Sequence, residues 1–341
     1  MNRFALVLAL AAVPSSFAAE PTLEEQAKGL FKPLSKQFDS KDNAITRDKV
    51  ELGKLLFFDK RLSKNQDVSC NSCHGLSTYG VDGQPTSSGH KKQRGDRNSP
   101  SVFNAGAHFV QFWDGRAATL EDQAKGPVLN PVEMAMPDAA TVEKVIASIP
   151  GYEPLFKKAF PGETRPITYD SIAKAIGAFE RTLATPSRFD AWLAGDPKAL
   201  TDAEKAGLKT FMTVGCTACH NGEGVGGGMY QKLGLVAAVP GLKDEGRAKV
   251  TKNAADQYFF KVPSLRNCEK TGPYLHDGSL TSLEDTVKFM GKYQLGRDLK
   301  ADEVASIVTF LKSLTGTLPK DAIVEPKALA SGKSTPRPDP T

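Results

Sequence analysis

Apolar residues recur every three to four positions over much of the chain, which is the pattern of amphipathic helices. Two stretches show it most clearly, with apolar side chains at Ile172, Ile176, Phe179 and Leu183 and at Val304, Ile307, Val308, Leu311 and Leu314. The spacings Thr201-x-x-Glu204 and Thr281-x-x-Glu284 have the form of capping boxes and predict helix starts. Alternating strand patterns are scarce. We therefore expect a mainly α fold with long loops and little β structure.

Turn-forming residues interrupt the helical pattern. Stretches rich in Gly and Pro cover 75–100 and 221–228, and Pro186, Gly195 and Pro197 separate two helical regions. A length of 341 residues is typical of two domains. We expect a leader over 1–18, an N-terminal domain over 19–190, a C-terminal domain over 191–326 and an extended tail over 327–341. The N-terminal segment packing back on the second domain is an alternative, and the tail fits a frayed end or an arm across a partner subunit.

Composition and charge narrow the class of protein. The chain is 40% hydrophobic, 24% charged and 8% aromatic, which is typical of a globular protein and excludes a disordered, collagen-like or multi-span membrane chain. The 44 basic and 39 acidic residues give a net charge of +5 and are interspersed. The charge pattern therefore gives no reason to expect nucleic acid as a partner.

The first residues have the features of an export signal. Arg3 precedes an apolar run over 4–13, and the small residues Ser16 and Ala18 stand at the −3 and −1 positions of a cleavage site. This pattern predicts a cleaved signal peptide and a mature chain that begins at Ala19. An uncleaved anchor is the rival interpretation, but the run is far shorter than the ~20 residues that span a bilayer. We therefore expect an exported protein without a membrane span.

Two copies of the pattern C-x-x-C-H carry most of the chemical information. They are Cys70-Asn71-Ser72-Cys73-His74 and Cys216-Thr217-Ala218-Cys219-His220. At this spacing two thiols add to the vinyl groups of one haem, while the adjacent histidine supplies an axial nitrogen. A thioredoxin-like pair does not need the histidine, and a zinc site needs a further Cys or His cluster. The sequence thus predicts two covalently bound haem c groups and leaves Cys268 as a small buried apolar residue.

The chain also contains an internal repeat. Three blocks recur 163 positions later, with Pro100–Asn104, Trp113–Arg116 and Leu120–Asp122 matched by Pro263–Asn267, His276–Ser279 and Leu283–Asp285. The two haem motifs are 146 positions apart, so the second copy has 17 extra residues between its haem motif and its Pro-Ser block. Two tandem cytochrome c-like haem domains are the simplest explanation.

The sixth ligand of each iron decides what each haem does. Of the five histidines, His90, His108 and His276 lie outside the two motifs, and they are possible sixth ligands along with the six Met. Met290 lies on an apolar helix end, and a thioether ligand raises the potential of the iron relative to a second imidazole. Core packing is the alternative for Met290. His90 follows Gly89 in a loop that is able to bring an imidazole to iron and to withdraw it, and solvent exposure is its alternative.

Peroxide reduction needs an open iron and a group that moves a proton between the two oxygens. Glu133 lies in an apolar, proline-restricted loop, where desolvation raises the pKa of a carboxyl group and keeps a transferable proton. Gln123 carries an amide that can donate to bound peroxide. Trp113 holds the repeat position of His276 and is a candidate electron relay. Surface positions for the first two residues and a core position for Trp113 are the alternatives.

Several blocks of the sequence match one known family. They are Cys70–His74, Gly89–Lys91, Phe112–Ala118, Gly126–Met134, Val262–Asn267, Pro273–Gly278 and Met290-Gly291-x-x-Gln294-Leu295. With these blocks nearly the whole mature chain resembles the bacterial dihaem cytochrome c peroxidases. The resemblance implies a periplasmic homodimer that reduces hydrogen peroxide to water. The two electrons come from a small periplasmic donor, either a c-type cytochrome or a blue-copper protein (cupredoxin).

The resemblance also implies a division of labour between the haems. The N-terminal haem is implied to be the low-potential, peroxidatic one, with His74 proximal and His90 distal in the oxidised resting state. The C-terminal haem is implied to be the high-potential, electron-transferring one, ligated by His220 and Met290. Trp113 is implied to lie on the route between them.

Two further sites follow from the resemblance alone. Gln123 and Glu133 are implied to form the peroxide pocket once the distal histidine leaves the iron. A calcium ion between the domains is implied to be bound by Asn98 and by the backbone carbonyls of Thr271 and Pro273, with waters completing its shell.

Other functions stay open at this stage. A related group that matures tryptophan-derived cofactors has Tyr in place of the Met ligand, and Tyr293 lies three residues from Met290. A dihaem electron carrier would need no peroxide pocket, and Glu133 with Gln123 argues against it. Some relatives are active when fully oxidised, and the loop around His90 fits either behaviour.

Overall fold

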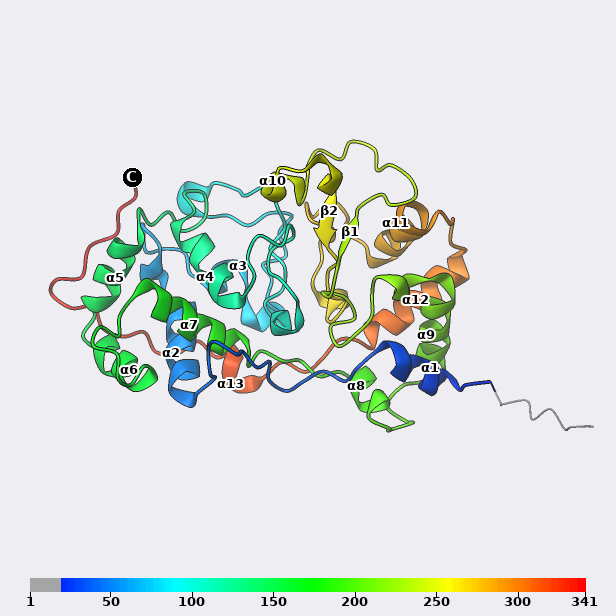
Figure 1. The fold of residues 1–341 in the computed structure, drawn as a ribbon, viewed down its shortest axis with the longest axis horizontal. Helices are drawn as coiled ribbons and strands as arrows, with labels where there is room; N and C mark the ends of the chain where they lie inside the picture. The colour runs from blue at the N-terminus through cyan, green and yellow to red at the C-terminus, as the bar shows by residue number, and fades with distance from the viewer. Residues whose placement is uncertain (1–19) are drawn as a thin grey trace, which may run out of the picture.

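The chain folds into two lobes that lie side by side along its long axis (Figure 1). The computed structural model describes residues 20–341, so the predicted signal peptide over 1–18 lies outside the described residues. Over 20–341 the structure consists of short helices, long loops and one two-stranded sheet. No helix in this range is long and apolar enough to cross a membrane. The prediction of a mainly α fold with long loops and little β structure is confirmed.

Thirteen α-helices and two strands make up the regular structure of residues 20–341. The helices are α1 (Leu23–Leu30), α2 (Arg47–Phe58), α3 (Cys70–Cys73), α4 (Leu120–Leu129), α5 (Ala139–Ala147), α6 (Tyr152–Ala159), α7 (Tyr169–Glu180), α8 (Arg188–Leu193), α9 (Asp202–Val214), α10 (Ala248–Thr251), α11 (Leu283–Leu295), α12 (Ala301–Lys312) and α13 (Lys320–Ile323). Strands β1 (Tyr230–Lys232) and β2 (Phe259–Lys261) pair antiparallel.

The two predicted capping boxes have different outcomes. Thr201 caps α9 as predicted, because its hydroxyl accepts from the Glu204 amide at 3.3 Å and the Glu204 carboxylate accepts from the Thr201 amide at 2.9 Å. The prediction at Thr281 is wrong by one residue. Ser282 is the N-cap of α11, and its hydroxyl accepts from the Asp285 amide at 3.1 Å. Serine and threonine are both good N-caps, so the spacing alone did not decide between them.

Each lobe is built around one close pair of helices. In the first lobe α2 packs on α7, and a Cβ at Gly53 would lie 1.9 Å from the Ala175 carbonyl oxygen. In the second lobe α9 packs on α12, and a Cβ at Gly207 would lie 2.1 Å from the Ser306 carbonyl oxygen. Both pairs therefore depend on glycine at the closest approach of the two backbones. Separate apolar cores surround the two pairs.

The two copies of the internal repeat make the same contact with Thr185. Asn104 and Asn267, 163 positions apart, both have a left-handed backbone, with φ of 62° and 61°. Each donates its Nδ2 to the Thr185 hydroxyl, at 2.8 and 2.9 Å. Antiparallel bridges over 111–117 and 274–280 repeat at the same spacing. These matching contacts are what two tandem copies of one fold would make.

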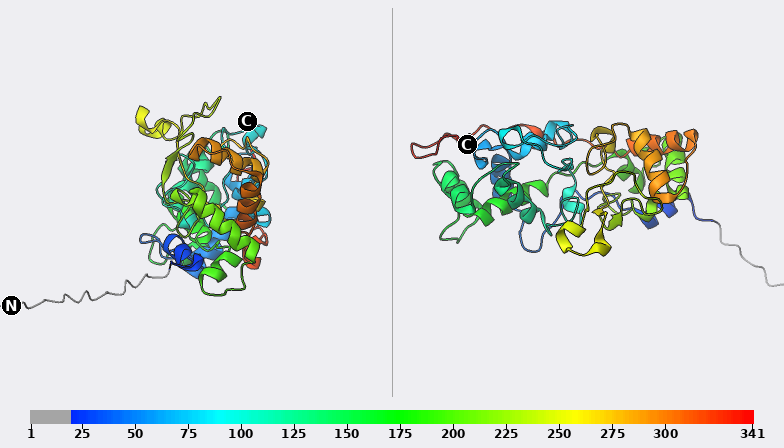
Figure 2. Two further views of the ribbon diagram at one scale, coloured as in Figure 1. Left: turned by 90° about the vertical axis from the view of Figure 1, so that its right-hand side faces the viewer. Right: turned by 90° about the horizontal axis from the view of Figure 1, so that it is seen from above.

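The two ends of the described chain cross over to the opposite lobes. Helix α1 packs in the second core, where the Phe31 ring lies 5.3 Å from the Phe189 ring. The C-terminal segment returns to the first lobe (Figures 1 and 2), where the Arg61 guanidinium donates to the Leu329 carbonyl at 2.9 Å. The predicted division between 190 and 191 falls within α8, whose Trp192 side chain is in the second core. The N-terminal and C-terminal segments therefore each contact the lobe to which they do not belong in sequence.

A buried ion pair holds the second lobe to the N-terminal segment. The Arg266 guanidinium, with no exposed side-chain area, donates two hydrogen bonds of 2.8 Å to Asp190. Asp190 also accepts from the Leu34 amide at 2.7 Å. Burial raises the pKa of Asp190, but the hydrogen bonds and the positive charge of Arg266 lower it by more. The pKa of Asp190 is therefore lower than that of an ordinary aspartate.

We expect Arg266→Leu to lower the free energy of unfolding by about 3–5 kcal/mol, because it leaves the Asp190 carboxylate buried without its cation. Urea unfolding of the haem-loaded protein measures this change. Lys125→Met, which breaks the exposed pair with Asp170, is the control and is expected to cost less than about 1 kcal/mol. Equal losses in both variants would contradict the role of burial.

Candidate active site

Both C-x-x-C-H motifs form single tight turns at the wall of a cavity. Cys70 to Cys73 form α3, and Cys216 to Ala218 form a 3-10 turn. Burial raises the pKa of Cys73 to about 11 and that of Cys216 to about 12, so these thiols are neutral. Each turn therefore presents two thiols to one apolar space, as thioether attachment to a haem requires.

The histidine of each motif is buried as a neutral imidazole. Burial lowers the pKa of His74, and it lowers that of His220 to about 4. The Nδ1 atom of each ring is buried without a hydrogen-bond partner among the described residues. At His220 this atom faces Gly226, where a Cβ would lie 3.1 Å away. Because Nδ1 of each ring is buried, Nε2 is the nitrogen that is left to bind an iron. With two thiols and one available imidazole nitrogen, each site fits a haem.

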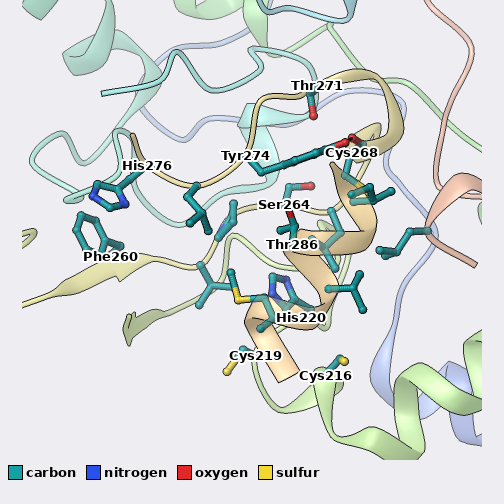
Figure 3. A pocket seen from close by; sticks show the side chains of 18 of the residues that line it. Cys216, Cys219, His220, Phe260, Ser264, Cys268, Thr271, Tyr274, His276 and Thr286 are labelled. Atoms are coloured by element: carbon teal, nitrogen blue, oxygen red, sulfur yellow. Dashed lines mark hydrogen bonds between the residues drawn. The ribbon is translucent and has the colours of Figure 1, made fainter. Parts of the chain in front are cut away.

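The two motifs line two different cavities. The cavity of the first lobe has a volume of about 510 Å³, and that of the second about 240 Å³. His220, its two cysteines and Thr286 of α11 all line the second cavity (Figure 3). The His276 and Phe260 rings pack against each other at the side of this cavity, with centroids 4.4 Å apart and planes tilted by 31° (Figure 3).

The helix that covers each cavity differs in the residue available to iron. Met290 on α11 lines the second cavity. Its repeat position, 163 residues earlier on α4, is Pro127, which lines the first cavity. A proline side chain has no atom that ligates iron, so α4 leaves the first cavity open where α11 offers a thioether. Tyr293 does not line the second cavity, and its ring packs on Phe289 at 4.6 Å.

The predicted proton-transfer group lines the first cavity. Glu133 and Gln123 both line this cavity, with His74 on its wall. Burial raises the pKa of Glu133, opposed by the charge of Arg116 and by a 2.8 Å hydrogen bond from Asn130. The pKa of this carboxyl group is therefore higher than that of an exposed glutamate, which suits a group that gains and loses a proton during the reaction.

The predicted distal histidine lies on a loop that contacts the Glu133 loop. The His90 amide donates to the Glu133 carbonyl at 2.8 Å, and a Cβ at Gly89 would lie 2.1 Å from the Val132 carbonyl oxygen. Lys91 and Lys92 follow with positive φ of 55° and 59°. The His90 side chain is buried but is not among the residues that line the cavity. The structure thus brings Glu133, Gln123 and His74 together, and it leaves His90 beside them.

Trp113 lies between the two cavities and lines both. Its Nε1 donates to the Asn98 carbonyl at 2.9 Å, and its ring is 6.5 Å from that of His276, its partner in the repeat. Asn98 also lines both cavities, while the other predicted calcium ligands, Thr271 and Pro273, line the second.

Three further titratable residues line the cavities. Sequence reasoning assigned no role to Glu180 and Lys261, and it considered His108 only as a possible sixth ligand. Glu180 is buried, its Oε2 has no hydrogen-bond partner among the described residues, and burial raises its pKa to about 8. His108 and Lys261 line both cavities. None belongs to a recognisable motif, because each reaches its cavity through long-range packing. The repeat offered no signal for them either.

Two haem-attachment turns in two helical lobes of one fold define a dihaem c-type cytochrome. A profile of the family "Di-haem cytochrome c peroxidase" matches residues 47–198. The chain is 48% identical over 327 residues to a cytochrome c551 peroxidase of Pseudomonas aeruginosa, covering 94% of each chain. It is 50% identical over 297 residues to a cytochrome c551 peroxidase of Nitrosomonas europaea, covering 86% of this chain and 87% of the relative.

A solved structure supports the same assignment. A MauG-like protein associated with microbial copper homeostasis superposes with a TM-score of 0.73 at 28% identity, covering 92% of this chain and 98% of the other. The chain belongs to the di-haem cytochrome c peroxidase family, and its enzyme class is cytochrome c peroxidase. Membership of this family implies two haem c groups, which agrees with the two attachment turns.

Proposed function

We propose that the chain is a periplasmic enzyme that reduces hydrogen peroxide to two waters with two electrons from a small c-type cytochrome or blue-copper protein. The observation that carries the proposal is the asymmetry of the two cavities. The first is lined by Glu133 and Gln123, whereas the second is lined by Met290, whose repeat position in the first cavity is Pro127. The first cavity therefore suits a substrate, and Met290 would offer a thioether ligand in the second, which suits electron transfer.

Residues of the chain hold the haems and arrange the substrate. Cys70 and Cys73 would hold the first haem with His74 as its axial ligand, and the second would be held by Cys216, Cys219, His220 and Met290. The bound haems supply irons that bind peroxide oxygen and exchange single electrons. Gln123 would donate a hydrogen bond to peroxide, and Glu133 would accept a proton from one peroxide oxygen and deliver it to the other.

His90 and Trp113 would connect the two halves of the reaction. In the fully oxidised enzyme, His90 would occupy the open side of the first cavity, and its loop would withdraw after one electron has reached the second haem. The link between His90 and the Glu133 carbonyl supports this, because it joins the loop to the proton-transfer group. Trp113, which lines both cavities, lies where electrons would pass between them.

We include a calcium ion and a homodimer in the proposal. Within residues 20–341 no cluster of three or more His, Cys, Asp or Glu side chains suits a metal ion, so a calcium site would depend on carbonyl oxygens. Asn98 supports this choice, because its Nδ2 donates to the Gln84 carbonyl at 2.9 Å and leaves Oδ1 as the ligating atom. The carbonyls of Thr271 and Pro273 would complete the protein ligands.

Calcium removal is expected to lower peroxide turnover, because the Asn98 carbonyl accepts the hydrogen bond from the Trp113 indole and would lose its support. The measurement is turnover and the haem spectrum before and after chelation. Added calcium should restore both, whereas magnesium should not, since it demands a smaller octahedral shell. Unchanged turnover and spectra after chelation would remove calcium from the account.

The direct test of the proposed function is peroxide-dependent oxidation of a reduced small cytochrome c. Fully oxidised enzyme is compared with enzyme reduced by one electron. Rapid turnover only after half-reduction is the expected result and would support the switch at His90. Equal turnover in both states would keep the peroxidase and remove the switch. No turnover with several donors, with both haems loaded, would indicate an electron carrier.

A further inference from the structure

A buried lysine lies between the two cavities without a counter-charge. Lys261, the last residue of β2, is 5% exposed and lines both cavities. Burial lowers its pKa to about 7, and no carboxylate opposes this shift. Within the described part of the chain, its Nζ forms no ion pair, and its one polar side-chain partner is Nδ1 of His108 at 2.9 Å. A buried ammonium group is strongly unfavourable unless an anion accompanies it.

His108 holds this lysine from the other lobe. The His108 ring is buried against Gly227, where φ is 77° and a Cβ would lie 2.3 Å from the ring. Burial and the charge of Lys261 lower the pKa of His108 well below its usual value, so the ring is neutral. The Nδ1 atom of His108 then accepts a hydrogen bond from the Lys261 ammonium group. This hydrogen bond between the two lobes fixes the position of the Lys261 Nζ atom.

The other cations around the cavities already have partners. Arg97 forms ion pairs with Asp114 and Asp244, Arg116 with Asp114, Arg266 with Asp190, and Lys249 with Asp244. Arg94 lines the first cavity but is exposed. Among the described residues that line either cavity, Lys261 is therefore the buried cation that lacks a carboxylate.

We propose that Lys261, positioned by His108, anchors a haem carboxylate at the junction of the two cavities. The inference rests on the proposed binding of two haems. A haem held through its vinyl groups carries two propionate carboxylates, and these need cations or hydrogen-bond donors where the protein buries them. Lys261 supplies an ammonium group that faces both cavities, so the carboxylate belongs to either the first or the second haem.

The test is a potentiometric titration of both haems in the holoenzyme. Lys261→Met removes the cation and leaves a buried carboxylate unpaired, which stabilises the oxidised iron. We expect the midpoint potential of one haem to fall by at least 59 mV, a tenfold change in its one-electron reduction equilibrium. A shift confined to the low-potential couple assigns the anchor to the first haem, and one confined to the high-potential couple assigns it to the second.

The control is Lys249→Met, which removes an exposed lysine at the first cavity and is expected to leave both couples in place. If Lys261→Met does not yield folded protein, Lys261→Gln keeps a donor to His108 and is expected to shift the same couple. No shift relative to the control, or an equal shift of both couples, would overturn the anchor. The readout does not use peroxide, so a missing second couple or absent turnover in wild-type protein would count against the proposed function instead.

Discussion

Glu133→Gln is expected to lower kcat/KM for peroxide by about 10²- to 10⁴-fold, the usual contribution of a positioned acid–base group. The amide keeps the shape of the side chain but cannot accept a proton and pass it on. Both haems and their spectra should be retained, because Glu133 lines the cavity but does not belong to the Cys70–His74 motif that would hold the haem. Steady-state turnover with a reduced cytochrome c measures the loss.

The pH dependence of turnover gives the same variant a second readout. Burial raises the pKa of Glu133 above its ordinary value of 4.5. A group that must accept a proton is inactive when protonated, so wild-type turnover should fall as the pH drops through this raised pKa. That acid limb should be absent from the residual activity of Glu133→Gln. Glu153→Gln, which changes an exposed carboxylate of the same lobe, is the control and should match wild type. Full activity in Glu133→Gln would remove the residue from the mechanism.

Met290→His is expected to lower the midpoint potential of the second haem by a sizeable part of the roughly 0.8 V that axial ligands span. A second imidazole lacks the preference of a thioether for ferrous iron. Electron uptake from the donor should slow with it, so turnover should become limited by the donor. Potentiometry of the two couples measures the change, and the couple of the first haem should stay in place.

Met212→Leu is the matched control for this prediction. Met212, on α9, packs on the core of the second lobe but does not line the second cavity. Its substitution should leave both midpoint potentials unchanged. A Met290 variant with wild-type potentials would show that the residue fills space in the core and does not bind iron.

The chemistry of the haem sites could be predicted from the sequence because it is local. Attachment needs two thiols and a histidine within five residues, so Cys70 to His74 and Cys216 to His220 are visible without a fold. The repeat was equally visible, since Asn104 and Asn267 keep the same spacing and the same left-handed backbone. Helix starts were less certain, as the shift from Thr281 to Ser282 shows.

The features that the sequence did not predict depend on long-range contacts. Lys261 and His108 are 153 positions apart and become a pair only when the lobes meet. The C-terminal tail has no periodicity, yet Arg61 and Gln66 of the first lobe donate to its carbonyls. Met290 and Pro127 occupy equivalent positions of the repeat. The consequence of this difference for the two cavities could not be predicted, because it depends on α11 and α4 lining equivalent cavities in the folded chain.

The proposed function requires that peroxide is reduced in the first cavity and that the haem of the second cavity supplies one of the two electrons. Half-reduced enzyme mixed with one equivalent of peroxide, without an external donor, tests this most directly. The account predicts that the ferrous spectrum of the second haem disappears as fast as peroxide is consumed, with one electron leaving each haem. Peroxide consumption while the second haem stays reduced would contradict it.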